Sequence, residues 1–293
     1  YTVPAAGGRA TQVALAGREP RWAPDGSRIY YRGDTWTGQI ASVPARGGEE
    51  TPVPIQSEYP DARLVVAFPS GSNDVSPDGR TIVFTGFYRD SQEAPGGSII
   101  FTVPSEGGMA RALTDPTEGN ASNPCWSPDG RWIAYTRQSS LGSQEDEEIC
   151  LAPSEGGPPK QLTTGTDQVG FTEVAWSPDG STIAYFGQDD TIRSISAAGG
   201  TARVLTGVSE ASWRLGLSWS PDGARLAYTD FEQILVVPAT GGDPEVVPTG
   251  FEGGVLQLDW SPDGQTFAFM GVRGGEEEVW LMSDFLDLIK TGG

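Results

Sequence analysis

The chain has 293 residues, with 39 Asp and Glu against 19 Lys and Arg, so its formal net charge is −20 at pH 7. An acidic excess of this size repels phosphate backbones and anionic headgroups, which argues against nucleic acid as a partner. The sequence contains no histidine. That absence excludes Ser-His-Asp and Cys-His nucleophile systems and histidine-ligated metals. No apolar stretch approaches the roughly 18 residues of a membrane span, so we expect no membrane insertion.

One short sequence motif recurs along the chain, in the form Trp-Ser-Pro-Asp-Gly or a close variant followed by an apolar run. We call its first residue the signature residue and its Pro-Asp-Gly turn the signature turn. The six copies of the motif begin at Trp22, Val75, Trp126, Trp176, Trp219 and Trp260. A regular period with one strand-turn-strand signature per unit indicates a radial array of small sheets, because one unit alone cannot bury both of its faces. We therefore predict an all-β fold: a six-bladed β-propeller of four-stranded antiparallel blades, forming a single domain over residues 1–293.

The first segment with strand character is Ala10 to Leu15, ahead of the first complete unit. The last unit supplies strands at 256–260, 266–270 and 278–282, but it lacks the Gly-Gly turn that introduces an outer strand. We predict that the N-terminal strand completes the last blade, which closes the ring and removes an open edge.

The unit around Trp176 shows the pattern of a blade most clearly. We predict its four strands, from the innermost outward, at 173–177, 182–186, 191–196 and 202–206. The turns between the first two and the last two strands share one end of the blade. All Pro-Asp-Gly and Gly-Gly turns should therefore gather on one face, which leaves the opposite, variable face to loops that differ between units.

The repeated aspartates fit a structural role. Proline fixes φ, aspartate accepts hydrogen bonds from nearby backbone amides, and glycine adopts a positive φ, so turn chemistry accounts for the motif. The residues concerned are Asp25, Asp78, Asp129, Asp179, Asp222 and Asp263. We likewise interpret the signature tryptophans as packing between blades.

The two cysteines, Cys125 and Cys150, fall on the expected first and third strands of one blade. Strands two apart in a sheet are separated by about 9.6 Å, which is beyond the reach of an unstrained disulfide. We expect two buried free thiols.

The run of Trp-Ser-Pro-Asp-Gly, Ile-Ala-Tyr, Val-Pro-x-x-Gly-Gly and Leu-Thr resembles the TolB-type propeller repeat, also called PD40 or WD40-like. The resemblance covers nearly the whole chain. It implies a six-bladed propeller, usually bacterial and periplasmic or extracellular, that often serves as a platform for protein binding. Some members accompany sensors, hydrolases or sugar-active enzymes. The sequence departs from these proteins in two ways: it contains neither the N-terminal domain of TolB nor a hydrolase domain.

Binding is best sought where the repeats disagree, because long irregular loops on a rigid scaffold commonly carry function. The second unit is preceded by a long connection, residues 57–74, and its second turn contains Phe87-Tyr-Arg-Asp90. Arginine and aromatic residues are favoured at binding hot spots. The candidate ligand-binding residues on the variable face are Trp36, Tyr59, Tyr88, Arg89, Arg137, Trp213 and Arg214. The plain alternative is that these loops only pack over the channel mouth.

Three acids, Asp74, Glu173 and Asp259, stand just before signature turns on expected innermost strands. If they converge near the central channel, they are candidate ligands for Ca²⁺, which prefers oxygen donors. We expect no cofactor to be required.

These patterns favour a monomeric, non-catalytic module that binds a protein or an oligosaccharide through the variable face and channel mouth. Two alternatives stay open. One is a histidine-independent carbohydrate-active enzyme, a polysaccharide lyase or glycoside hydrolase, that uses carboxylates such as Glu173 and Asp259. The other is a sensor ectodomain of a larger protein.

Overall fold

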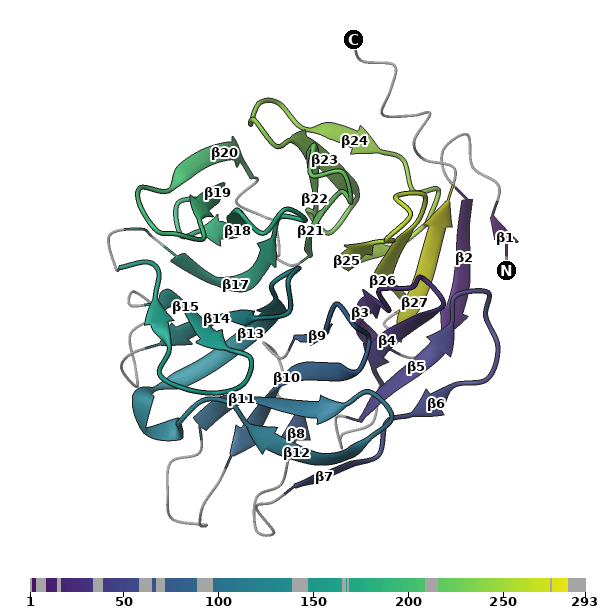
Figure 1. Ribbon diagram of the computed structural model, residues 1–293. Coiled ribbons are helices and arrows are strands. Elements are labelled where there is room, and N and C mark those ends of the chain that lie inside the picture. The colour runs from purple at the N-terminus through teal and green to yellow at the C-terminus, as the bar shows by residue number, and fades with distance from the viewer. Residues whose placement is uncertain are drawn as a thin grey trace.

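The computed structural model describes residues 2–3, 9–14, 17–33, 39–57, 65–66, 72–88, 97–138, 147–164, 167, 169–208, 216–274 and 276–283. Its strands form six small sheets arranged in a ring (Figure 1). The predicted six-bladed β-propeller is confirmed.

The blades follow chain order around the ring. Blade 1 contains β3 (Arg18–Trp22), β4 (Arg28–Arg32), β5 (Ile40–Pro44) and β6 (Thr51–Pro52). Blade 3 contains β13 (Asn120–Trp126), β14 (Trp132–Gln138), β15 (Glu147–Pro153) and β16 (Lys160–Gln161). Blade 4 contains β17 (Val169–Trp176), β18 (Thr182–Gly187), β19 (Thr191–Ser196) and β20 (Arg203–Gly207). Blade 5 contains β21 (Leu217–Trp219), β22 (Arg225–Thr229), β23 (Ile234–Pro238) and β24 (Glu245–Val247).

Blade 2 departs from the four-stranded prediction. Its inner position is shared by β8 (Val65–Val66) and β9 (Asn73–Val75), which both pair with β10 (Thr81–Tyr88). Outside β11 (Gly97–Pro104) and β12 (Gly108–Ala112), the crossing from blade 1 adds β7 (Ile55–Ser57) as a parallel edge strand. A 3-10 turn, η1 (Pro116–Glu118), then leads into blade 3.

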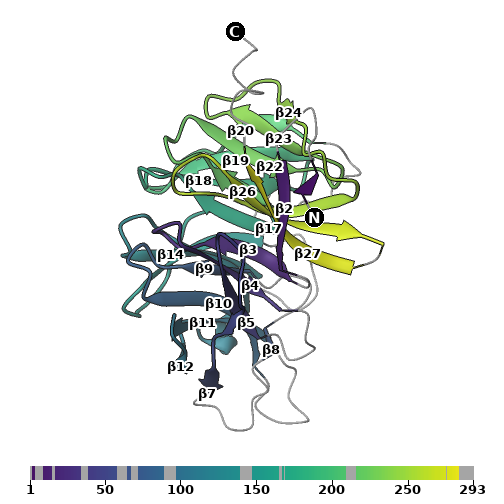
Figure 2. The ribbon, with the colours of Figure 1, turned by 90° about the vertical axis from the view of Figure 1, so that its right-hand side faces the viewer.

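Blade 6 closes the ring as the sequence predicts. It contains β25 (Gly254–Trp260), β26 (Phe267–Arg273) and β27 (Glu276–Ser283). The N-terminal strand β2 (Arg9–Ala14) pairs antiparallel with β27, and the two lie side by side in Figures 1 and 2. A short strand that was not expected, β1 (Thr2–Val3), extends the sheet beyond β2.

The core consists of six hydrophobic clusters, one at each boundary between blades. Each signature residue belongs to the cluster that its blade shares with the preceding blade. Trp176, for example, packs with Leu151 of blade 3 and Ile183 of its own blade. Val75 takes the same place between blades 1 and 2. The tryptophans therefore join blades, as the repeat pattern indicates.

The signature turns are stabilised by hydrogen bonds among their own residues. In five of the six, the aspartate accepts a hydrogen bond from the preceding serine hydroxyl, and that serine accepts one from the backbone five residues on. Ser177 shows both contacts, with Asp179 at 2.6 Å and the Thr182 amide at 3.0 Å. In blade 1, Ala23 replaces the serine, and Asp25 instead accepts from Ser27. The structure thus gives these aspartates a local role in the fold.

Both cysteines are free thiols on β13 and β15, as expected. Cys150 is buried, whereas Cys125 is only partly buried because it lies at the centre of the ring. Among the described residues, no helix is long and apolar enough to cross a membrane.

Candidate functional site

The innermost strands of the blades surround the centre of the ring (Figure 1). Ionisable side chains from these strands meet there. Arg21 of β3 is the central residue, and its Nη2 lies 3.3 Å from Oε2 of Glu173 on β17. Its Nη1 donates hydrogen bonds to the carbonyl oxygens of Pro20 and Leu258. Blades 1 and 4 stand opposite each other in the six-bladed ring. The ion pair therefore spans the centre and fills it at this level.

Two further acids face Arg21 and also tie blades together. Asp74 accepts hydrogen bonds from the backbone amides of Val75 and of Trp126, the latter in blade 3, at 2.8 and 2.7 Å. Asp259 of blade 6 accepts from the amide of Trp22 in blade 1 at 2.8 Å. Each carboxylate thus satisfies the amide of the signature tryptophan in the next blade.

Other residue types at the position immediately before the signature tryptophan make the same contact, in which a side chain accepts a hydrogen bond from a backbone amide of the next blade. We call this contact the latch. Ser218 of blade 5 accepts a hydrogen bond from the amide of Trp260 in blade 6 at 3.0 Å, and its hydroxyl also donates to Asp259. The thiol of Cys125 in blade 3 receives a backbone hydrogen bond from Trp176 in blade 4. This position therefore links blades at several boundaries, whether or not it carries charge.

A second ion pair lies beside the first, toward the variable face. The Nη2 atom of Arg32 is 3.5 Å from Oε1 of Glu19, and both side chains are buried. Glu19 has a φ of +55°, and it falls where the pairing of β3 with β4 shifts register. Its amide donates to the side-chain oxygen of Gln257, which sits at the corresponding bulge of β25 with a φ of +28°. These bulges direct polar side chains toward the centre.

We call Glu19, Arg21, Arg32, Asp74, Glu173 and Asp259 the axial cluster. Burial raises the pKa of Glu19 to about 7 and that of Asp259 to about 6, although neighbouring guanidinium groups act in the opposite direction. Burial also raises the pKa of Asp74. Burial works against the charge of Arg21, but Glu173, Asp259 and Asp74 hold its pKa above the ordinary value. Four acids thus face two permanent cations, and protonation relieves the excess of negative charge.

The proposed calcium ligands, Asp74, Glu173 and Asp259, do come to one place in the fold. The cation they share there is the guanidinium of Arg21. Both oxygens of Asp74 already accept backbone hydrogen bonds. Across the described part of the chain, no group of three or more Cys, Asp or Glu side chains is arranged to hold a metal ion. Calcium binding by these residues stays a prediction.

Most of the predicted binding residues on the variable face cannot be placed. Trp36, Tyr59, Arg89, Trp213 and Arg214 lie outside the described residues, and Tyr88 is described only as the last residue of β10.

Arg137, near the end of β14, is the predicted residue that the structure does place. Its guanidinium contacts Glu148 at 3.2 Å and Glu118 at 3.7 Å. These two carboxylates orient Arg137 and offset its charge, so it is held in place at the edge of the face.

Two exposed aromatic residues lie on the variable face, as Arg137 does, and belong to the candidate binding surface. Phe87 lies near the end of β10 and is 43% exposed, and Phe231 lies in the turn between β22 and β23 and is 37% exposed. Phe231 has a φ of +77°, which is unusual for a bulky residue. Its carbonyl accepts a hydrogen bond from the Val255 amide of blade 6 at 2.7 Å. Its ring lies over Gly254, where a side chain would collide with it. Sequence reasoning missed Phe231, since no pattern marks its positive φ.

Comparison with known proteins gives matches of two kinds. Residues 76–197 match the family model described as the dipeptidyl peptidase IV N-terminal region. Over 202 residues the chain is 27% identical to dipeptidyl-peptidase 5 of Porphyromonas gingivalis, covering 67% of this chain and 28% of that protein. It is 31% identical over 137 residues to the uncharacterized peptidase YuxL of Bacillus subtilis, covering 44% and 18%. The chain spans under a third of the length of these relatives.

Solved structures of similar fold come from varied proteins. A putative TolB from Agrobacterium tumefaciens has a TM-score of 0.64 at 18% identity, covering 93% of this chain and 90% of its own. An oligogalacturonate lyase in complex with manganese has a TM-score of 0.63 at 14% identity, covering 99% and 96%. These identities establish the fold alone. The chain is a six-bladed β-propeller, and its fold is similar to that of the putative TolB.

Proposed function

We propose that this propeller is a non-catalytic module that binds a polypeptide on its variable face, over the axial cluster. The observation that carries the proposal is that the acids at the centre already have structural partners. Glu173 pairs with Arg21, and Asp259 holds the Trp22 amide and the Ser218 hydroxyl. A catalytic carboxylate pair needs side chains free to meet a substrate, whereas these two are buried in contacts between blades.

The described part of the variable face has features of a recognition surface. Phe87 and Phe231 present apolar area, and Arg137 is held rigidly by its two carboxylates. Aromatic and arginine side chains commonly provide the energy of protein interfaces. The net charge of −20 favours ligands that carry basic residues.

The choice of a polypeptide over an oligosaccharide rests on the relatives matched by sequence. The two relatives are named as a dipeptidyl-peptidase and an uncharacterized peptidase, and the matching family model is named as the N-terminal region of dipeptidyl peptidase IV. We assign this chain the binding part of such a role and no hydrolysis. By its resemblance to TolB-type proteins, we place it in the periplasm or outside the cell, as a monomer.

The test is capture of peptides from a tryptic digest of casein on the immobilised chain, read by mass spectrometry. Tryptic peptides end in Lys or Arg, which suits an acidic surface. We expect Phe87→Ala or Phe231→Ala to reduce retention about fivefold, as loss of a partly buried aromatic contact does. Met109→Ala is the matched control, because Met109 is 47% exposed but lies on the outer strand β12.

Two results would overturn the proposal. One is retention that is equal in the wild-type and both phenylalanine variants. The other is turnover of polygalacturonate, followed by the absorbance of unsaturated uronate, that is lost in Glu173→Gln. The second result would assign the centre of the ring to carbohydrate chemistry.

A further inference from the structure

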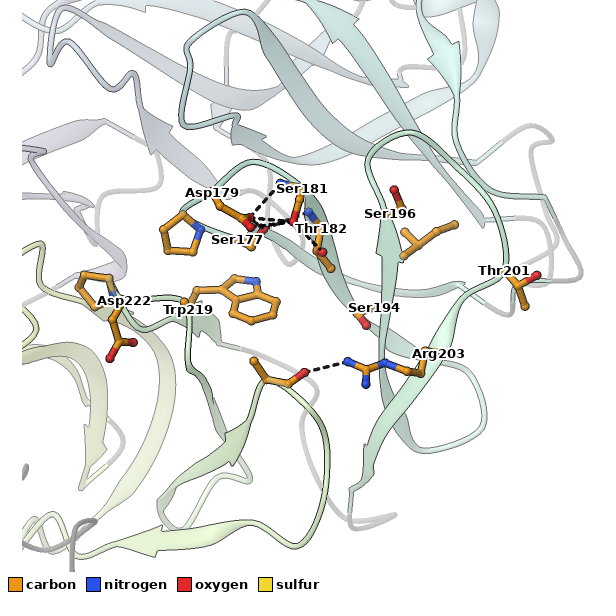
Figure 3. A pocket seen from close by; sticks show the side chains of 15 residues that line it. Ser177, Asp179, Ser181, Thr182, Ser194, Ser196, Thr201, Arg203, Trp219 and Asp222 are labelled. Carbon is orange, nitrogen blue, oxygen red and sulfur yellow. Dashed lines mark hydrogen bonds between the residues drawn. The ribbon is translucent and has the colours of Figure 1, made fainter.

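A pocket of about 610 Å³ opens between blades 4 and 5, on the face that carries the Pro-Asp-Gly turns (Figure 3). It lies on the opposite face from the surface proposed above. Its volume falls within the range of small-molecule sites, about 300 to 1,000 Å³. Trp219 lies at the centre of the pocket, with Thr182, Ser194 and Arg203 beyond its ring (Figure 3).

The repeat supplies an internal comparison. A pocket of about 560 Å³ occupies the corresponding place between blades 3 and 4. Strand register shows that Trp132 and Leu151 there stand at the positions of Thr182 and Ser194 here. The two pockets are similar in size but differ in chemistry. The pocket beside Trp219 has the hydroxyl side chains of Thr182 and Ser194 where the other pocket has the large apolar side chains of Trp132 and Leu151.

The indole of Trp219 makes a hydrogen bond to the neighbouring blade, whereas the indole of Trp260 donates within its own blade, to the carbonyl of Gly264 at 3.0 Å. The Nε1 atom of Trp219 donates to the carbonyl of Ala175 in blade 4 at 3.1 Å, which fixes the ring across the boundary. In contrast, the indole nitrogens of Trp22, Trp126 and Trp176 are buried and have no partner among the described residues. Trp219 is only partly buried and lines the pocket. Its indole thus forms a fixed aromatic wall.

The polar groups around this wall suit hydroxyl ligands. Hydroxyl side chains both donate and accept hydrogen bonds, as sugar hydroxyls do. They come from six lining residues: Ser177, Ser181, Thr182, Ser194, Ser196 and Thr201. Ser194 is 6% exposed. In the described structure its hydroxyl has no hydrogen-bond partner, so it is available to a ligand.

The charges of the pocket disfavour anions. Hydrogen bonds from Ser177 and Ser181 hold the pKa of Asp179 below its usual value, and those from Ser220 and Ala224 do the same for Asp222. Both carboxylates therefore stay ionised at neutral pH. Arg203, the facing cation, donates to the carbonyls of Ala239 and Thr240 at 2.8 and 3.1 Å. A phosphate or uronate would meet two carboxylates and only one guanidinium, which is already engaged.

We propose that this pocket binds a neutral pyranose, either a free sugar or the end residue of an oligosaccharide. The apolar face of the sugar ring packs on Trp219, and its hydroxyls exchange hydrogen bonds with Ser194, Thr182 and the outer carboxylate oxygen of Asp222. The combination of one aromatic wall with several convergent polar groups is what distinguishes a ligand pocket from a crevice between blades.

The experiment is saturation-transfer NMR with titration of methyl β-D-glucopyranoside, methyl β-D-galactopyranoside and methyl α-D-mannopyranoside, with galacturonate as the anionic probe. We expect at least one neutral glycoside to bind with a Kd of about 1 to 10 mM, typical of a small polar ligand, and galacturonate about tenfold more weakly. Trp219→Val should abolish binding. Val75 occupies the same place in blade 2, so valine is compatible with the fold.

Two further variants separate binding from folding. Trp176→Val removes the corresponding tryptophan of the neighbouring pocket and should leave the affinity within about twofold, because it alters packing alone. Ser194→Ala removes one hydroxyl with little change in shape and should weaken binding about fivefold. The proposal is overturned if no neutral glycoside binds at 50 mM, if galacturonate binds as well as they do, or if folded Trp219→Val and Ser194→Ala bind as the wild-type does.

Discussion

Arg21 and Glu173 meet across the ring, with Nη2 of Arg21 3.3 Å from Oε2 of Glu173. One residue belongs to blade 1 and the other to blade 4, so 152 positions of sequence separate the partners of a single contact. Asp74 and Asp259 surround the same guanidinium from blades 2 and 6. The centre of this propeller is therefore a polar core that joins four blades.

The first prediction concerns this ion pair. Removing one partner of a buried pair leaves the other charge uncompensated, which commonly costs about 3 to 5 kcal/mol. Because Asp74 and Asp259 remain beside Arg21, we expect Glu173→Gln to lower the free energy of unfolding by about 2 kcal/mol. Urea unfolding of Arg21→Gln, Glu173→Gln and the double variant measures the coupling. Strictly additive losses would show that the pair does not interact.

The second prediction tests the latch between the first and last blades. Asp259→Ala leaves the buried amide of Trp22 without its acceptor, and we expect a loss of about 2 to 3 kcal/mol in the free energy of unfolding. Asp263→Ala is the matched control from the same blade. Its carboxylate serves an exposed turn, so a loss of about 1 kcal/mol is expected. Equal losses would contradict a role in joining blades.

The third prediction concerns Glu147, a buried acid at the start of β15 whose Oε2 has no partner among the described residues. Burial raises its pKa from 4.5 to about 8. The folded state therefore holds a proton that the unfolded state releases, and stability falls as pH rises from about 4.5 to about 8. Glu147→Gln should remove this loss and add about 1 to 3 kcal/mol at pH 9 relative to wild-type.

Thermal unfolding between pH 5 and 9 measures the effect of Glu147. Glu148→Gln is the control, because Glu148 faces Arg137 at 3.2 Å and its replacement should keep the decline of wild-type stability with pH. The raised pKa values of Glu19 and Asp259 act in the same direction as that of Glu147. A stability that rises steadily from pH 5 to 8 would contradict this assignment.

The fourth prediction addresses calcium. Since Arg21 already occupies the place among Asp74, Glu173 and Asp259, added Ca²⁺ gains few free oxygen ligands there. We expect 5 mM Ca²⁺ to shift the Tm by less than about 1 °C, because a ligand stabilises only as far as it binds the folded state. A rise of several degrees that is lost in Asp259→Asn would instead support the sequence-based prediction that these acids bind calcium.

Much of the fold was predictable because six copies of one turn specify six equivalent blades. The short outer strand after Arg9 and the missing Gly-Gly turn of the last unit were enough to predict closure by β2. The extra strand β7 was not predictable, because its parallel pairing with β12 depends on how the crossing from blade 1 runs.

The site was predictable only in part. Asp74, Glu173 and Asp259 were recognised from their places before the signature turns, but their shared partner Arg21 was not. Arg21 stands immediately before Trp22, as Asp74 and Asp259 stand before Val75 and Trp260, so this shared place in the repeat could have drawn attention to it. Its pairing with Glu173 was not predictable, because which blades face each other across a ring is a property of the closed fold. The same holds for Glu19, whose inward direction depends on a bulge with positive φ.

The most direct test of the central claim is to incubate the chain with the casein peptides it retains and then to weigh the bound and released material by mass spectrometry. A non-catalytic binding module should return every captured peptide at its original mass, with capture reduced in Phe231→Ala. Shortened peptides that accumulate with time, or no capture by the wild-type chain, would contradict the account.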